Sequence, residues 1–465
     1  MFTSKRAALI VAALSCTMAT PLAAQTKPSP TDELSALRAE LARLSARVDQ
    51  LEGELEQAEG KAEAASAAAA AASESAAAAT KSAAAVEAGA EKAPSIKFKG
   101  APVIEAAGGW SFKPRGRLMY DAGFVNAPES TGREDGFGNE VRRARLGVEG
   151  DIPGGFGYKF ELDFAGNEVE AADAFLSYSD GPLEIMVGHQ NNFQSLEELT
   201  SSLHTTFIER AAFTDAFGFE RRIGVSAVYK SGIVLAQAGA FTDNFADTAT
   251  NNRGFDARLV LMPKAGDAQL HFGGSFHYND LDDPAATVRY RQRPLVHFTS
   301  ERFVNTGNLA ADSETGFGLE AAAIAGPFHV ASEGFWQKVN RPAALTDPTF
   351  FGGYAEVGYY LTKGDTRGYK SGKFDRTKPA NPVGKGGIGS VQLNLRYDYL
   401  DLTDAGIVGG TQNGYQAALV WKPTDYTLFA LNYGKMSYDD AVYAATGGDR
   451  SYDVDAVGVR AQIDF

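Results

Sequence analysis

The chain has 465 residues, a formal net charge of −14 and a single cysteine. The acidic excess argues against nucleic acid as a partner, because phosphate binding requires a basic surface. Beyond the N-terminal segment there is no run of about 18 apolar residues, which excludes a bundle of membrane-spanning helices. Gly accounts for 50 residues and aromatic residues for 11%. This composition leaves a soluble all-β protein or a membrane β-barrel, which hides apolar residues on alternate positions.

Residues 1–24 have the pattern of a secretory signal peptide. A basic start is followed by an apolar core and by small residues before a predicted cleavage site at Gln25. Acylation of Cys16, as in a lipoprotein, is the alternative, but Ala13 rather than Leu stands three residues before it. Cleavage would remove the cysteine, so the mature chain is expected to contain no disulfide, thiolate nucleophile or cysteine metal site.

Residues 25–93 are predicted to form a coiled coil that continues into an Ala-rich helix. Ser29 and Pro30 suit the N-cap and the first helical position. Over residues 31–57 apolar residues recur at spacings of three and four, the a/d pattern of a coiled coil. A lone surface helix or a linker is the alternative. The apolar positions are Leu34, Leu37, Leu41, Leu44, Val48, Leu51 and Leu55.

After a linker at 94–109, residues 110–465 read as successive strands. Apolar and polar residues alternate in segments such as 158–164, 270–278, 391–399 and 429–433, separated by Gly- and Asp-rich turns. Period-two alternation of this kind is typical of a transmembrane barrel. At roughly 22 residues per strand and connection, the segment predicts about 16 antiparallel strands, a size that leaves an aqueous channel.

The last strand is the most informative one. Val457, Val459, Ala461, Ile463 and Phe465 are expected to face lipid, and the residues between them to face the lumen. The intervening charges are tolerable only on a wet face, because a charge at the lipid midplane costs about 2–4 kcal/mol. An even strand number places both chain ends on the periplasmic side, with the coiled coil below the pore. We therefore expect an all-β barrel in the bacterial outer membrane.

Residues 191–222 interrupt the alternation. A connection of more than about 15 residues without secondary structure is usually functional or disordered. In a water-filled barrel we interpret it as a loop folded into the lumen that narrows the channel; an ordinary outer loop is the alternative. The constriction candidates in it are Glu197, Glu198, Glu209 and Arg210.

Closely spaced arginines are the second candidate feature. Arg143 and Arg145 lie on one face of a predicted strand, and Arg289, Arg291 and Arg293 are spaced by two, so they project alike from an extended chain. Lining water, such residues form a ladder of anion sites, as in pores that use rings of Arg or Lys. A solvated basic strand in an outer loop is the alternative.

The sequence offers no pattern for catalysis. The six histidines lack the HExxH spacing, and Gly-x-Ser-x-Gly and P-loop motifs are absent. We therefore predict neither an enzyme nor a cofactor.

Several separated blocks resemble the phosphate-selective porin O and P family. They are VRRARLGVEGDIPGGFGYKFELDFAGNEVEAADAFLSY, SLEELTSS, TFIER, RRIGVSAVY, GGYAEVGYYLT, GKFDRTKP and LRYDYLDL. The resemblance implies a homotrimer of 16-stranded barrels that passes small anions such as phosphate. The positions that match the family's anion-handling residues are the arginines Arg117, Arg142, Arg143, Arg289, Arg291 and Arg293, the acid Asp173, the serines Ser201 and Ser202, and the periplasmic lysines Lys373 and Lys378.

Two departures from the family pattern bear on selectivity. Glu198 stands where phosphate-specific members carry an anion-contacting lysine, and it would repel phosphate unless Arg210, Arg142 or Arg143 neutralises it. Arg145 replaces an aromatic residue and adds a positive charge. Pore membership is unaffected, but strict phosphate selectivity is not assured. A general or sugar porin with a Tyr and Phe track, and a structural envelope tether acting through the coil, therefore stay open.

Overall fold

A computed structural model describes residues 30–87, 94–166, 168–242, 251–283 and 285–465. The predicted signal peptide lies outside them. The chain divides into two units, Met1–Ser82 and Ala83–Phe465. No helix in the described part of the chain combines the length and the apolarity needed to cross a bilayer.

Helix α1 (Pro30–Glu87) is continuous over 58 residues, which corresponds to about 87 Å at 1.5 Å per residue. Alanine supports such a helix because it loses no side-chain entropy. The predicted seam residues whose side chains are described are exposed within the single chain, at 49% for Val48 and 69% for Leu41. The helix is therefore confirmed, and its pairing into a coiled coil stays a prediction.

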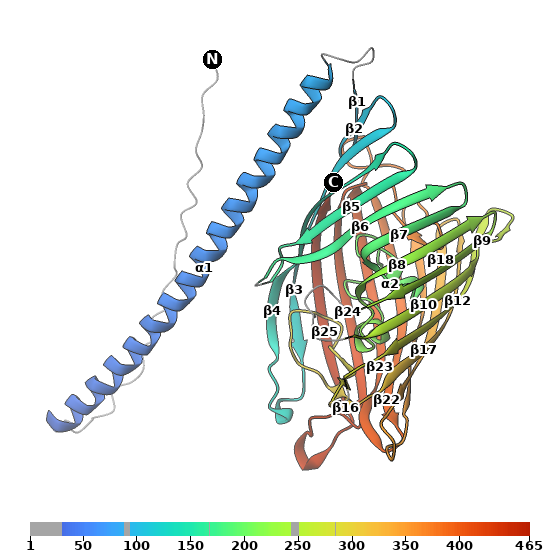
Figure 1. The fold of residues 1–465 in the computed structure, drawn as a ribbon. Coiled ribbons are helices and arrows are strands. Elements are labelled where there is room, and N and C mark those ends of the chain that lie inside the picture. Colours follow the sequence, from blue (N-terminus) through green and yellow to red (C-terminus); the bar gives the residue numbers. More distant parts are fainter. Residues whose placement is uncertain (1–29, 88–93, 167, 243–250, 284) are drawn as a thin grey trace, which may run out of the picture. The chain divides into compact units, whose positions relative to one another are not determined.

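Unit Ala83–Phe465 contains a closed antiparallel barrel, shown as a ribbon in Figure 1. In the described residues sixteen strands follow one another in sequence order, and β25 closes the ring by pairing with β3 from Asp455↔Asn126 to Asp464↔Arg117. The predicted fold class and strand number are confirmed for the barrel. Its strands are β3 (Trp110–Asn126), β4 (Gly136–Ile152), β5 (Phe156–Asp163), β6 (Glu170–Asp180), β7 (Leu183–Asn191), β8 (Arg221–Ser231), β9 (Val234–Phe241), β10 (Arg253–Leu261), β12 (Ala268–Asp280), β17 (Ser313–Ala325), β18 (Phe328–Asn340), β19 (Thr349–Tyr360), β22 (Ser390–Asp404), β23 (Ile407–Thr424), β24 (Thr427–Asp439) and β25 (Tyr452–Asp464).

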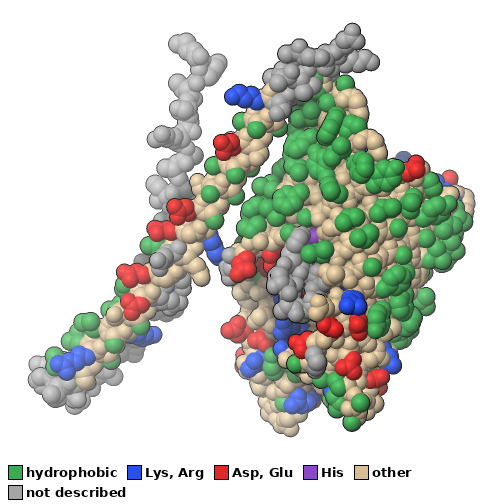
Figure 2. Space-filling view, viewed as in Figure 1, with side chains coloured by type: hydrophobic (Ala, Val, Ile, Leu, Met, Phe, Trp, Pro, Cys, Tyr) green, Lys and Arg blue, Asp and Glu red, His purple; other side chains and the backbone are tan. Residues whose placement is uncertain are grey.

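Along each strand, side chains point alternately to the outer wall and to the lumen, as the sequence predicts. In β25, Val457, Val459 and Ile463 are exposed on the outside, whereas Arg460 and Asp464 are buried inside. Figure 2 shows hydrophobic side chains over much of the visible outer wall of the barrel. An apolar outer band is what contact with lipid requires, because unpaired polar groups there would lose their hydration.

The predicted linker 94–109 forms a hairpin. Strands β1 (Ser95–Lys99) and β2 (Ala101–Ala106) pair with each other, and β2 pairs with the start of β3. Figure 1 shows this hairpin at the barrel end that carries the C-terminus. Gly100 has a φ of +82° at the tip and packs so closely on Tyr426 that a Cβ would meet its ring. The remaining short elements of the turns are η1 (Glu129–Thr131), β11 (Lys264–Ala265) and η2 (Thr446–Gly448).

Three long connections bury side chains inside the barrel. Phe213 of the connection 192–220, Tyr290 of 281–312 and Phe374 of 361–389 belong to one buried apolar cluster, together with Phe335 of the wall. Part of the lumen is thus filled by an apolar core. The short elements of these connections are α2 (Leu196–Leu199), α3 (Ala212–Ala216), β13 (Thr287–Val288), β14 (Arg291–Gln292), β15 (Val304–Asn305), β16 (Leu309–Ala310), β20 (Gly368–Lys370) and β21 (Lys373–Asp375).

Candidate functional site

Residues 192–220, here called the constriction loop, connect β7 to β8 and lie inside the barrel. Most of their side chains are buried. Near its start, Ser195 is a non-glycine residue at φ +66°, whose hydroxyl accepts a hydrogen bond from the Glu198 backbone N–H and so caps α2. Left-handed backbone is uncommon outside glycine. It redirects the chain here from the end of β7 into the lumen.

Backbone N–H groups of the constriction loop are satisfied by acceptors on one side of the barrel wall. The N–H groups of Leu196 and Glu197 donate to the two carboxylate oxygens of Glu333 on β18, at 2.8 and 2.7 Å. The N–H of Ala212 donates to Asp398 on β22 at 2.9 Å. The N–H of Ile208 donates to Asn432 on β24, also at 2.9 Å. Buried backbone groups need such partners, so these side chains fix the course of the loop.

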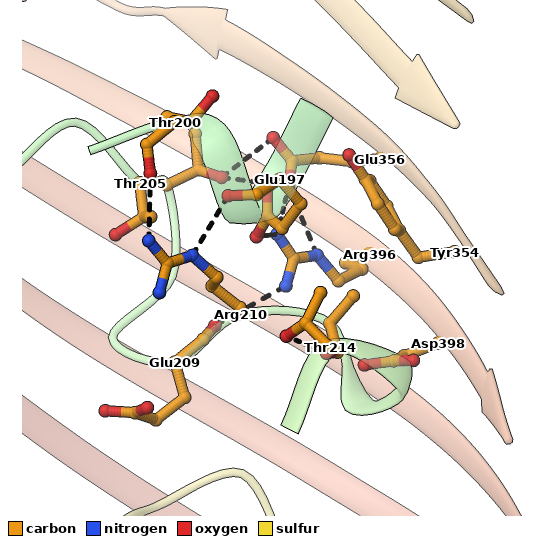
Figure 3. Close-up of polar contacts among 12 residues, drawn as sticks. Glu197, Thr200, Thr205, Glu209, Arg210, Thr214, Tyr354, Glu356, Arg396 and Asp398 are labelled. Carbon is orange, nitrogen blue, oxygen red and sulfur yellow. Dashed lines mark hydrogen bonds and ion pairs between the residues drawn. The ribbon is translucent and has the colours of Figure 1, made fainter. Parts of the chain in front are cut away.

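A buried ion network adds to this anchoring, as Figure 3 shows. Arg396 on β22 contacts Glu197 of the loop and Glu356 of β19, both at 2.7 Å. Thr206 donates its hydroxyl to Glu356 at 2.8 Å, and the Arg396 guanidinium lies 4.3 Å from the centre of the Phe207 ring. Glu197, predicted to line the constriction, therefore faces the wall instead.

The opposite side of the lumen holds two cavities of about 310 and 610 Å³. They are lined by strands β3 to β8, the constriction loop, and parts of the connections 281–312 and 361–389. Because five lining residues are common to both, their side chains mark the place where the cavities adjoin. These shared residues are Arg143, Arg145, Glu198, Arg210 and Arg221.

A β-bulge places two consecutive arginines inside. The pairing of β3 with β4 shifts so that Met119 faces Arg143 and Tyr120 faces Val141, which leaves Arg142 unpaired. Such an insertion redirects side chains that strict alternation would send to the other face. Arg142 and Arg143 thus both line the lumen, where alternation alone would turn Arg142 to lipid.

The two arginines differ in their partners. Arg142 binds both carboxylate oxygens of Glu209, at 2.8 and 3.1 Å. Burial alone would raise the pKa of Glu209, but Arg142 and Arg460 lower it below its usual range. Arg143 has no ion pair with any described residue, and its guanidinium donates there only to the sulfur of Met119, at 3.9 Å. Arg143 is therefore a guanidinium without a carboxylate partner at the junction of the two cavities.

The other wall arginines are balanced by acids. Arg117 contacts Glu161 at 3.2 Å, and Arg145 contacts Glu161 at 3.2 Å and Asp163 at 2.7 Å. Asp173, the acid implied by the family resemblance, lines the larger cavity. It contacts Arg221 at 2.6 Å and also pairs with Lys159. The cationic wall thus carries carboxylates that partly cancel its charge.

Glu198 is neutralised by its own loop. Arg210 lies 3.3 Å from the Glu198 carboxylate, and its guanidinium also donates to the backbone carbonyls of Glu197 and Thr200, both at 2.9 Å. Arg210 therefore holds two parts of the loop together and supplies the positive charge that neutralises Glu198. Burial raises the pKa of Glu198 above its ordinary value, although Arg210 opposes the shift.

Some of the remaining predicted residues line the larger cavity and others do not. Arg117 donates to the Ser202 hydroxyl at 3.1 Å, and Ser201, Ser202 and Lys373 line the larger cavity. Lys378 is exposed and is not among the described lining residues.

The predicted arginine ladder lies in the connection 281–312 rather than in a barrel strand. Arg293 lines the smaller cavity and lies 3.5 Å from Asp215. Arg289 donates to Asn305 at 2.9 Å, and neither it nor Arg291 is among the described residues that line the two cavities. A ladder that includes all three stays a prediction.

Sequence reasoning did not single out several lining residues. Arg115, Lys159, Arg221 and Arg376 line the larger cavity and are not among the predicted residues. The inward course of residues 361–389 was also missed. Its signal was present, because this connection is far longer than the turns between neighbouring strands usually are.

A closed barrel that is apolar outside, and charged and hollow inside, defines an outer-membrane porin channel. The model of the family described as phosphate-selective porin O and P matches residues 112–465, and the chain belongs to this family. The predicted resemblance is thereby confirmed.

Two relatives and two solved structures add to this. An uncharacterised protein of Caulobacter vibrioides is 48% identical over 383 residues, covering 80% of this chain and 77% of that protein. Porin O of Pseudomonas aeruginosa is 28% identical over 339 residues, covering 65% and 75%. OmpT of Vibrio cholerae is 10% identical, and the match covers 78% of this chain and 99% of that one. OprB of Pseudomonas putida is 12% identical, and the match covers 77% of this chain and 94% of that one. Both superpose with a TM-score of 0.50 and support the fold alone.

The anchoring network makes a prediction about stability. Replacing Arg396 with Leu leaves Glu197 buried without its cation and Glu356 with Arg367 alone, at 3.4 Å, which we expect to cost about 3–5 kcal/mol in the free energy of unfolding. Equilibrium urea unfolding in lipid vesicles measures this, and single-channel recording should show a noisier current as the loop loosens. Arg253→Leu, at an exposed position, is the control; an equal loss in both variants would contradict the anchoring role.

Proposed function

We propose that this porin passes small hydrophilic solutes by passive diffusion and prefers anions. The observation that carries the proposal is the set of residues where the cavities adjoin, four arginines and one glutamate that is paired with one of them. Arginine stays charged at every physiological pH and can hold an oxyanion by two parallel hydrogen bonds. The family description and the relative named Porin O support phosphate as one such anion.

Arg143 is the residue on which we expect anion preference to depend most. The other arginines of the junction, Arg145, Arg210 and Arg221, form ion pairs with acids, so their fields are partly cancelled at the distance of a permeating ion. Arg143 forms no ion pair with any described residue. A unit charge at about 4 Å contributes about 1 kcal/mol in water and more where the dielectric constant is lower.

Replacing Arg143 with Gln should reduce anion selectivity. We expect a fall of about fivefold or more in the anion-to-cation permeability ratio, the equivalent of about 1 kcal/mol. The reversal potential of the purified protein in a planar bilayer under a KCl gradient measures this ratio. Arg289→Gln, in the connection 281–312, is the matched control. Equal effects of the two substitutions would mean that selectivity depends on the overall charge rather than on Arg143. If phosphate did not change the current through either variant, a general or sugar porin would be favoured.

Glu198 should make selectivity depend on pH. Its raised pKa means that it takes up a proton at a higher pH than an ordinary glutamate. Since protonation removes a negative charge from the constriction, anion selectivity should rise as the pH falls through this pKa. Glu198→Gln should give the high selectivity already at neutral pH and abolish the change. Reversal potentials between pH 4 and 7.5 test this, with Glu134→Gln, on an outer turn, as control; an unchanged titration in Glu198→Gln would exclude the residue.

The proposal extends to assembly as a homotrimer whose α1 helices form a periplasmic coiled coil. Exposure of the leucine seam in the single chain supports it, because helices with an exposed a/d stripe bury that stripe against one another. The envelope tether is the alternative role of the same helix. Deleting residues 25–93 separates the two: conductance should persist in either case, whereas loss of envelope integrity in cells is expected only for a tether.

Leu44→Asp should weaken the trimer. Each chain would lose the burial of one leucine, about 1.5–3 kcal/mol, and a charge would enter the seam. The temperature at which the trimer dissociates on semi-native gels should fall. Ala42→Asp places the same charge off the seam and should leave that temperature unchanged. Equal behaviour of the two variants would argue against a coil.

A further inference from the structure

The β1–β2 hairpin continues the barrel wall at the place where β25 ends. β25 pairs with one edge of β3 as far as Asp464↔Arg117, and β4 occupies the other edge. β2 then takes the edge that β25 leaves, through three residue pairs that include Ile104↔Phe112. The hairpin therefore lengthens the wall at the barrel end that carries the C-terminus, as Figure 1 shows.

The hairpin has a polar and an apolar face, because side chains alternate along both of its strands. On the polar face Lys97 pairs with Glu105 at 2.6 Å, and Lys99 follows two residues further on. The other face is open in the single chain, where Ile96 is 59% and Phe98 is 78% exposed. This hairpin apolar face consists of Ile96, Phe98, Pro102, Ile104, Phe112 and Trp110.

The hairpin apolar face points to the same side as the lipid-facing wall. In β3, Leu118 and Tyr120 are exposed on the outside, whereas Arg117 is buried inside. β3 is one continuous strand, so its alternation carries Phe112 and Trp110 to the outer side as well. Figure 2 shows hydrophobic side chains continuing to this end of the barrel. The face is therefore an extension of the surface that contacts lipid.

The tip of the hairpin is held against the turn between β23 and β24. Gly100 packs there on the ring of Tyr426, without space for a Cβ. Near the same turn, Trp421 stacks on Phe429 on the outer wall, with ring centroids 5.4 Å apart. Tryptophan is enriched where a membrane meets water. Trp110 and Trp421 therefore mark this end of the barrel as the level of the membrane–water interface.

The outer side of β3 is longer than the hydrocarbon layer. Trp110 and Phe124 both lie on it and are 14 residues apart. At about 3.4 Å per residue and a tilt of about 40°, this separation spans about 35 Å along the barrel axis, whereas the apolar band is about 25 Å tall. Part of this surface must lie among the lipid headgroups, and the tryptophans assign that part to the hairpin end.

We propose that the hairpin apolar face is a lipid-contact surface, which lies in the phospholipid headgroup region at this end of the barrel. Ile96 and Phe98 would contact the acyl chains next to the headgroups, and Lys97 and Lys99 would remain in water. Lipid is the occupant because the face continues a wall that already contacts lipid. Its combination of aromatic residues with lysines on the opposite face is also typical of segments that lie in an interface. The hairpin would fix the depth of the barrel in the membrane, a role separate from solute passage.

Spin labels on the two faces test the surface. Phe98→Cys and Lys97→Cys are each labelled with a nitroxide in the exported protein, from which cleavage is expected to remove Cys16, in vesicles of phosphatidylethanolamine and phosphatidylglycerol. Oxygen dissolves in lipid and a nickel chelate stays in water, so the ratio of oxygen to nickel collision rates should be severalfold higher at position 98 than at position 97. An equal ratio would place both faces in water and overturn the proposal. Low collision rates with both reagents at position 98 would show a protein contact, such as a second copy, and would also overturn it.

Tryptophan fluorescence provides a measurement that leaves the hairpin unaltered. In a chain with Trp336→Phe and Trp421→Phe, Trp110 is the only tryptophan. Its fluorescence should be quenched more strongly by phospholipids with bromine on acyl carbons near the headgroup than by phospholipids with bromine near the bilayer centre. Absence of quenching by both lipids would overturn the lipid contact, and stronger quenching from the bilayer centre would overturn its proposed depth.

Discussion

A segment that leaves the β-sheet and enters the lumen needs hydrogen-bond partners for its backbone N–H and C=O groups. This requirement determines the arrangement of side chains inside the barrel. Glu333, Asp398 and Asn432 accept from backbone N–H groups of the constriction loop, at 2.7 to 2.9 Å. Glu356 of β19 is also buried and accepts from the Thr206 hydroxyl of the loop, and its charge is offset by Arg396, which also pairs with Glu197 of the loop. These wall acceptors and Arg396 form one unit that supports the loop. The narrow passage exists because that unit keeps the loop to one side.

The barrel consequently has two apolar regions. One faces lipid, and the other fills part of the lumen, where Phe213 lies 6.2 Å from Phe335 and Phe303 lies 5.2 Å from Tyr438, measured between ring centroids. Strands β18 to β25 therefore carry large apolar side chains on their inner face as well. Burial of such rings provides hydrophobic stabilisation that a water-filled barrel lacks. The permeation path is displaced towards β3–β8, where the charges are.

The sequence was sufficient for the barrel, its strand number and the inward loop, because a lipid-facing band imposes period-two alternation that is visible residue by residue. It was not sufficient for Arg142, whose inward position depends on a bulge that only the pairing of β3 with β4 defines. Glu197 shows a different limit. Its place in the loop was predictable from the sequence. Whether its side chain faces the pore or the barrel wall depends on Arg396, which lies 199 residues away in the chain. Arg289 and Arg291 follow the predicted two-residue spacing, yet that spacing alone does not say whether a segment is part of the barrel.

The wall side chains that accept hydrogen bonds from the constriction loop and most arginines of the passage lie in different halves of the chain. Glu333, Glu356, Asp398 and Asn432 stand on β18 to β24, whereas Arg143, Lys159 and Arg221 stand on β4, β5 and β8. Substitutions in the first half of the barrel can therefore alter which solutes pass while the loop keeps its support. The hydrogen bonds that support the loop and the charge of the passage can therefore change separately during evolution.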